Sequence, residues 1–94
     1  MKKLFVLVRN DLPLAYQGVQ AGHAVAEYLL NEREWDNGTL VYLQVDNIQR
    51  WLGRLQFLGI PHYPFKEPDI GNQVTAISIH SDGKLFRNLK LMGS

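Results

Sequence analysis

The chain of 94 residues carries 10 Lys and Arg against 9 Asp and Glu, and it contains no cysteine. The net charge of +1 excludes a strongly basic nucleic-acid binder, so any RNA contact has to come from a local patch. The lack of cysteine excludes disulfides and thiolate chemistry and favours a cytoplasmic protein. No apolar segment is long enough to span a bilayer, so we expect no membrane partner. The length predicts one domain over residues 1–94.

The first predicted element is a strand over residues 3–9. Its apolar residues do not alternate with polar ones, which is typical of a central strand that is buried on both faces. The apolar run is too short for a signal peptide. In the polar corner that follows, Asp11 is expected to cap the coming helix. Ligands in open α/β sheets bind beyond the carboxyl ends of the strands, so Arg9, Asn10 and Asp11 are candidate ligand-binding residues.

A helix is predicted from about residue 14 to residue 31, with polar side chains along one stripe at Tyr16, Gln20, His23 and Glu27. His23 could be a general base that Glu27 orients, or a histidine that only hydrogen-bonds within the fold. Tyr16 and Gln20 could bind a ligand at the helix N-terminus. Tyr16 could equally be a packing aromatic residue.

Small residues follow a second stripe of this helix. Gly18, Gly22 and Ala26 are four residues apart, and glycine is unfavourable inside a helix unless packing or a ligand requires it. We therefore expect this stripe to lie close against the sheet or another helix, with Val19 and Leu29 beside it.

The second half of the chain alternates strands and helices. A strand is predicted over 39–45. A second helix then runs from a cap at Asp46 or Asn47 to about residue 58, and Gly59 is its C-cap.

Two further strands and a helix complete the chain. An edge strand over 60–66, a turn over 67–72 and a strand over 73–80 are expected to form an antiparallel pair. Strict alternation in the last strand would place Thr75 and Ala76 on opposite faces. A short helix is predicted over 84–91.

This order, β-α-β-α-β-β-α, predicts a small mixed α/β fold. The βαβ start implies two parallel strands joined by a right-handed crossover. We expect one mixed four-stranded sheet with helices on both faces.

Other polar residues are weaker candidates. Glu67 and Asp69 precede the last strand, where they could perform acid–base chemistry or simply form the turn, and the Thr75 hydroxyl could reach a ligand. His62 and His80 form no metal-binding motif, so neither a metal site nor a cofactor is expected.

Five stretches share their order and spacing with one known family: FVLVRNDL at 5–12, VQAGHA at 19–24, LGIPHY at 58–63, VTAISI at 74–79 and KL at 90–91. Together they resemble the archaeal and eukaryotic type of peptidyl-tRNA hydrolase, and the chain looks most like a short, divergent bacterial and phage branch. The resemblance implies a mixed four-stranded sheet, a homodimer, and hydrolysis of the ester that joins a peptide to the 3′ ribose of tRNA.

The resemblance also implies site residues. Gln20 and His23 match the family and would position the ester and a water, while Thr75 matches the threonine of the last strand. The acidic residue before that strand corresponds to Glu67 or Asp69. Arg9 would touch phosphate.

One departure from the family leaves a second interpretation open. The family opens its first helix with a Gly-Lys-Gly-Lys run, from which a lysine is tied to catalysis, but here Tyr16 stands in that place and carries no positive charge. The chain could therefore be a non-catalytic protein that binds a small nucleotide-like ligand, such as a signalling nucleotide or an ADP-ribose derivative. Tyr16, Trp35 and Tyr63 could stack on its base. A third interpretation is a structural or regulatory dimer.

Overall fold

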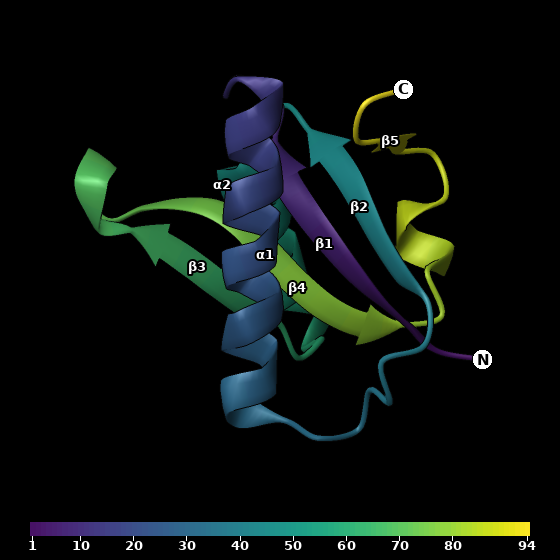
Figure 1. Ribbon diagram of the computed structural model, residues 1–94. Coiled ribbons are helices and arrows are strands. Elements are labelled where there is room, and N and C mark those ends of the chain that lie inside the picture. Colours follow the sequence, from purple (N-terminus) through teal and green to yellow (C-terminus); the bar gives the residue numbers. More distant parts are fainter.

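A mixed sheet of five strands forms the centre of the computed structural model, which describes residues 1–94 (Figure 1). The strands lie in the order β3-β4-β1-β2-β5. Their bounds are β1 Lys3–Arg9, β2 Leu40–Val45, β3 Tyr63–Glu67, β4 Gln73–Ser81 and β5 Lys90–Leu91. Strands β1 and β2 run parallel, and β3 pairs antiparallel with β4 at one edge. The predicted mixed α/β domain, its parallel pair and its edge strand are confirmed.

Two α-helices cover opposite faces of this sheet. Helix α1 (Leu14–Asn31) lies in front of the sheet in Figure 1, and α2 (Ile48–Leu58) lies behind it. Side chains of β1 point alternately to the two sides, so Val6 joins Ala21 of α1 in one apolar cluster and Leu7 joins Leu55 of α2 in the other. No helix is both long and apolar enough to cross a membrane.

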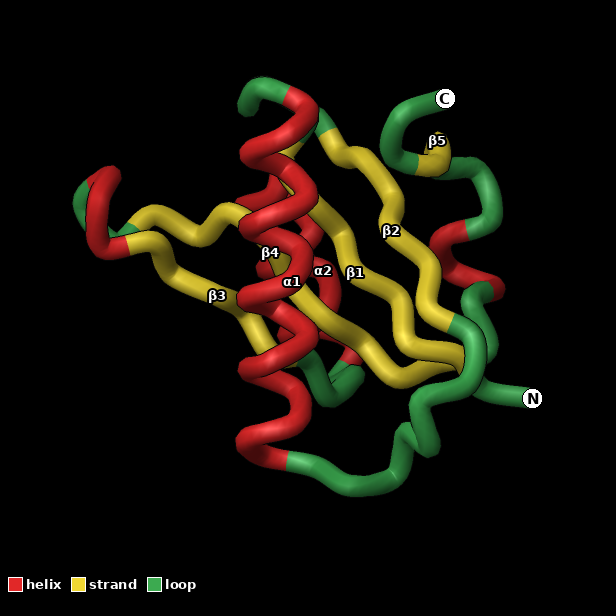
Figure 2. The backbone as a smooth tube through the Cα atoms, in the orientation of Figure 1, coloured by secondary structure: helices red, strands yellow, loops and turns green.

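The C-terminal segment differs from the predicted helix over 84–91. Lys84–Phe86 form only a single 3-10 turn, and Lys90–Leu91 pair with β2 as the fifth strand (Figure 2). Phe86 is buried against the rings of Phe5 and Trp51, so the segment is held by a core contact and by edge pairing. The sheet therefore has five strands rather than four, and two α-helices rather than three.

Helix α1 packs through a different stripe from the predicted one. An added Cβ at Gly22 would meet no atom within 4 Å, and Ala26 is exposed. The buried side chains are instead those of Gln17, Gln20, Ala21, Ala24 and Tyr28. The predicted close-packed stripe is wrong because two hydrogen-bonded glutamines, which resemble surface residues in the sequence, point toward the sheet.

The predicted helix caps are right for α2 and wrong for α1. The backbone N–H of Arg50 donates to Oδ1 of Asn47 at 3.0 Å, and Gly59 ends α2 in the left-handed conformation with φ 67°. Pro13 occupies the N-cap position of α1 without a side-chain hydrogen bond. Asp11 does not cap α1 because its carboxylate binds Arg9 instead.

A bulge at Thr75 breaks the alternation of β4. Phe65 pairs with Ala76 and Lys66 pairs with Val74, so Thr75 is left without a partner on β3. The Thr75 hydroxyl bonds to α1, and Ala76 belongs to the apolar cluster beneath the same helix. The expectation that Thr75 and Ala76 face opposite sides is therefore wrong. The bulge turns a polar side chain toward α1.

Candidate functional site

Four side chains from three distant segments meet between α1, the end of β3 and the bulge of β4. Thr75 Oγ1 donates to Gln20 Oε1 at 2.5 Å, and Gln20 Nε2 donates to Glu67 Oε1 at 3.2 Å. The Tyr16 hydroxyl donates to the same Glu67 oxygen at 3.0 Å. We call these four residues the Glu67 network. It places the carboxylate at the end of a chain of donors.

The network leaves one oxygen of Glu67 free. The Glu67 residue is 8% exposed, and its Oε2 bonds no protein group. Every buried side-chain nitrogen and oxygen has a partner in this structure, so Oε2 reaches solvent. A carboxylate with one oxygen fixed by two donors and the other open to water has the geometry of a general base.

Gln20 and Thr75 support this carboxylate from inside. Both residues are 0% exposed, and both ends of the Gln20 amide are bonded within the network. Gln20 therefore positions Glu67 and does not itself face a ligand. Partial burial and the hydrogen bond to Glu67 raise the pKa of Tyr16, so its hydroxyl remains a donor at neutral pH.

The other two predicted catalytic residues lie outside the network. The His23 side chain is exposed and stacks on Phe65, with ring centroids 4.4 Å apart and planes 7° apart. It makes no hydrogen bond with Gln20 or Glu27. Asp69 lies exposed in the 3-10 turn Pro68–Ile70, near enough for its charge to raise the pKa of Tyr16.

The predicted ligand-binding corner forms a separate group on the α2 side. The Arg9 guanidinium donates to both carboxylate oxygens of Asp11, at 2.9 and 2.8 Å, and to Gln73 Oε1 at 2.8 Å. The Arg9 side chain holds the pKa of Asp11 below its usual value. These residues and the start of α2 line a depression of about 420 Å³. The Asn10 backbone bonds to Val45, and its side chain is exposed.

A second buried glutamine, which sequence reasoning missed, fixes this corner to the helix. Gln17 Nε2 donates to the carbonyl of Leu12 at 2.7 Å, and Gln17 Oε1 accepts from Gln44 Nε2 at 2.8 Å. Gln17 is three residues before Gln20, so both side chains lie on one face of the helix. This spacing was the signal in the sequence that could have identified Gln17.

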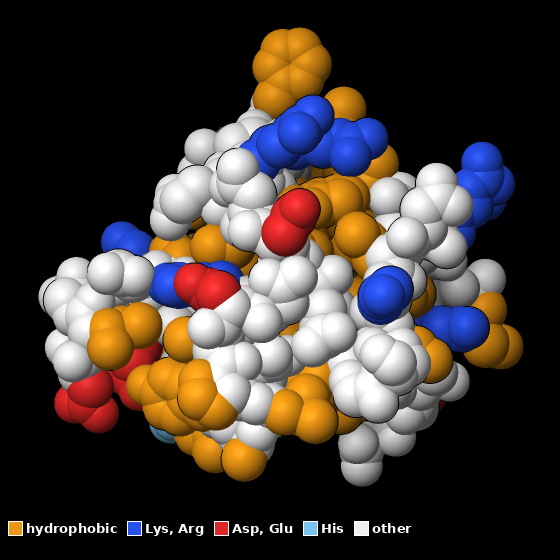
Figure 3. All heavy atoms as spheres, turned by 90° about the horizontal axis from the view of Figure 1, so that it is seen from above, with side chains coloured by type: hydrophobic (Ala, Val, Ile, Leu, Met, Phe, Trp, Pro, Cys, Tyr) orange, Lys and Arg blue, Asp and Glu red, His pale blue; other side chains and the backbone are white.

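Seen from above, Lys and Arg side chains form one continuous patch near the upper edge, and the others lie singly among uncharged and hydrophobic side chains (Figure 3). Because the net charge is only +1, any nucleic-acid contact has to come from a local group of positive side chains.

Comparison with known proteins adds no family. The chain matches no protein-family model, and no curated protein is similar to it at a significant level.

Proposed function

We propose that this protein is a peptidyl-tRNA hydrolase-like esterase in which Glu67 is the general base. The observation that carries the proposal is the Glu67 network. Gln20, Glu67 and Thr75, three residues selected from separate parts of the sequence, share one set of hydrogen bonds that leaves Glu67 Oε2 open to water. The sequence resemblance to peptidyl-tRNA hydrolases supplies the substrate class.

The proposed reaction uses a water at Glu67 Oε2. The water attacks the ester carbonyl while Glu67 takes its proton, which gives a tetrahedral oxyanion. Protonation makes Glu67 a poorer acceptor, so the Tyr16 hydroxyl can donate to the oxyanion instead. When the intermediate collapses, the ribose oxygen leaves and takes the proton from Glu67. The products are a peptide with a free carboxyl group and tRNA with a free 3′ hydroxyl.

His23 has a binding role in this proposal. The stacked rings of His23 and Phe65 lie beside the network and offer a flat face on which the terminal nucleobase can stack. Arg9, at the same end of the sheet, is the candidate phosphate contact. A cytoplasmic homodimer, expected from the sequence, is part of the proposal.

The first test is cleavage of a peptidyl-tRNA by the purified chain. We expect release of the peptide and of intact deacylated tRNA, with initial rates proportional to protein concentration. A preparation that is folded and free of host hydrolases but produces no turnover would contradict the proposed activity.

A non-catalytic nucleotide binder is the second candidate function. It is favoured because the network contains no cationic side chain to stabilise a developing oxyanion, whereas the exposed His23–Phe65 stack suits a base. Calorimetry against a panel of nucleotides and ADP-ribose derivatives tests it. Saturable binding without any ester cleavage supports this candidate, and the absence of any binder in the panel removes it.

A further inference from the structure

Two arginines on the outer face of α2 have no partner within the protein. Arg50 and Arg54 are exposed, and neither side chain forms a hydrogen bond or an ion pair. The one ion pair of the chain joins Arg9 to Asp11. Like charges four residues apart repel each other and slightly destabilise a helix. A negatively charged ligand on this face would remove the repulsion.

The ring of Trp51 holds one of these arginines in place. The Arg54 Cζ lies 4.9 Å from the centroid of the Trp51 ring, and that ring packs against buried Phe86 with centroids 5.6 Å apart. A stacked guanidinium keeps the N–H groups at its edge free, and this planar fork of donors matches the oxygens of a phosphate. Because the side chain is already positioned, binding has to order less of it.

The arginine face of α2 adjoins the corner that holds Arg9. A depression of about 170 Å³ beside Arg50 and Arg54 shares Asp46 and Asn47 with the depression of about 420 Å³ at Arg9. In Figure 3, a continuous patch of Lys and Arg side chains lies at the upper edge, which is the side of the molecule where α2 lies. We call Arg9, Arg50 and Arg54 the arginine track.

The arginine track begins beside the Glu67 network. The Arg9 guanidinium donates to Gln73 Oε1 at 2.8 Å, and Gln73 pairs with Glu67 where β3 meets β4. Positive groups therefore follow one another from the proposed general base, across the end of the sheet, to the outer face of α2. A strand of nucleic acid that follows them would bring one end to Glu67.

We propose that the arginine track binds the phosphate backbone of an RNA strand whose 3′ end reaches Glu67. This inference rests on the proposed function and names the surface that holds the tRNA. Arg50 and Arg54 are about 6 Å apart along the helix axis, which is comparable to the spacing of successive phosphates on one strand. Two carboxylates lie along the track: Asp11 is bound to Arg9, whereas Asp46 opposes the RNA.

Fluorescence anisotropy with a labelled, deacylated tRNA measures this binding without any cleavage. We expect affinity to fall as salt rises, because binding releases counterions from the phosphates. Arg50→Gln and Arg54→Gln should each weaken binding several-fold and reduce the slope of log affinity against log salt by about 1. Asp46→Asn should strengthen binding because a repulsive charge is removed. Both arginines are exposed, so their substitution should leave the fold intact.

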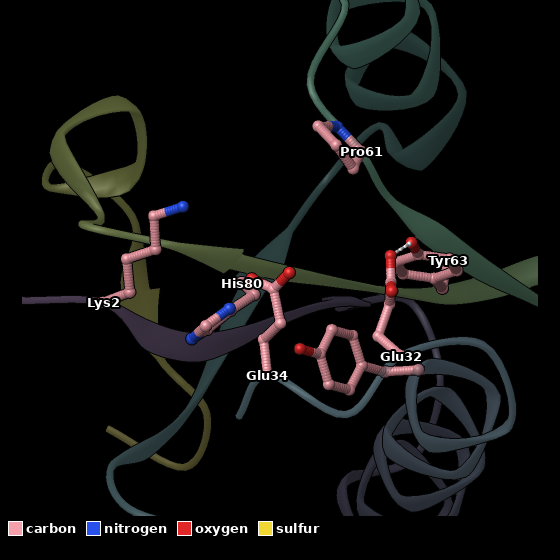
Figure 4. A pocket seen from close by; sticks show the side chains of 7 residues that line it. Lys2, Glu32, Glu34, Pro61, Tyr63 and His80 are labelled. Atoms are coloured by element: carbon pink, nitrogen blue, oxygen red, sulfur yellow. Dashed lines mark hydrogen bonds between the residues drawn. The ribbon is translucent and has the colours of Figure 1, made fainter. Parts of the chain in front are cut away.

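Arg33→Gln is the matched control for the change in net charge. Arg33 is exposed and lies between Glu32 and Glu34, which line a cavity at the opposite end of the sheet (Figure 4). Its substitution should leave the affinity and the salt slope nearly unchanged. Vesicles that contain phosphatidylserine provide a second anionic surface for comparison, because Phe57 is 89% exposed beside the arginines of α2.

Three results would overturn the inference. They are the absence of saturable tRNA binding, a double Arg50→Gln and Arg54→Gln variant that binds as tightly as Arg33→Gln, and binding to the vesicles in preference to tRNA. The proposed esterase is judged separately. Binding of tRNA through the track without cleavage would contradict only the esterase, whereas cleavage by the double variant with the wild-type KM would contradict only the track.

Discussion

Hydrogen bonding at the candidate site converges on a single atom, Glu67 Oε1, which accepts from both Tyr16 and Gln20. Behind it, Thr75 donates to the other end of the Gln20 amide, and neither residue is exposed to water. A buried polar group that loses its partner costs more free energy than the hydrogen bond itself contributes. The buried hydrogen bond between Thr75 and Gln20 should therefore contribute to the stability of the fold.

Replacing Thr75 with valine tests this dependence. Thr75→Val keeps the side-chain shape but leaves Gln20 Oε1 without its donor, so we expect the free energy of unfolding to fall by about 1–3 kcal/mol. Urea denaturation measures the change. The exposed Thr39, whose side chain makes no hydrogen bond, provides the matched control Thr39→Val. Equal stability of the two variants would show that the buried hydrogen bond has no net effect.

Tyr63 makes stability depend on alkaline pH. Its pKa is raised to about 12 in the folded protein, mainly by the hydrogen bond to Glu32, whereas a tyrosine in the unfolded chain ionises near 10.0. The stabilisation is complete below pH 10 and is lost as the pH rises toward 12, because the unfolded chain releases its proton first. We expect thermal unfolding temperatures to fall across this range. Tyr63→Phe should flatten that fall, and an unchanged slope would contradict the assignment.

Among the secondary-structure elements, those with strong local signals were predictable from the sequence. The apolar run of β1, the cap at Asn47 and the left-handed Gly59 gave the parallel pair and α2 correctly. The bulge at Thr75 was not predictable, because it is a mismatch between two strands. Lys90–Leu91 form a strand because they pair with the open edge of β2. The local sequence of the segment does not reveal this partner.

The residues of the candidate site were predictable from the sequence, whereas the hydrogen bonds that join them were not. Its members Gln20, Glu67 and Thr75 could be selected by residue type and resemblance. Their connection could not, because it depends on the bulge and on the rotation of α1 about its axis. His23 is exposed and lies outside the network, and a stripe of polar residues in the sequence does not reveal which member faces the sheet.

Gly83 offers a test of how the C-terminal segment is held. Its φ is +82°, and an added Cβ would lie 2.3 Å from Cζ of Phe5, so Gly83→Ala should displace the turn that carries Phe86. We expect the free energy of unfolding to fall by more than about 1 kcal/mol. Gly53→Ala in α2, where a Cβ would meet nothing within 4 Å, is the control and should be neutral or stabilising. Equal effects would contradict the close contact.

At the scale of the whole molecule, two unrelated groups of polar residues occupy opposite ends of one small sheet. The molecule measures 33 × 28 × 27 Å, so neither group is far from the other. The end with the Glu67 network has a carboxylate open to water and a stacking surface, which suits an ester on a nucleotide. The other end has a small cavity whose lining includes Glu32, Glu34 and Lys2.

The most direct test of the proposed function is the rate at which Glu67→Gln cleaves peptidyl-tRNA. The glutamine can still accept from Tyr16 and Gln20, so the fold should be retained, but it cannot act as a base. We predict a rate at least about 100-fold below wild type. Asp36→Asn, which replaces an acidic residue remote from the network, should retain the wild-type rate. Folded Glu67→Gln protein that hydrolyses the substrate as fast as wild type would contradict the assignment of Glu67 as the base.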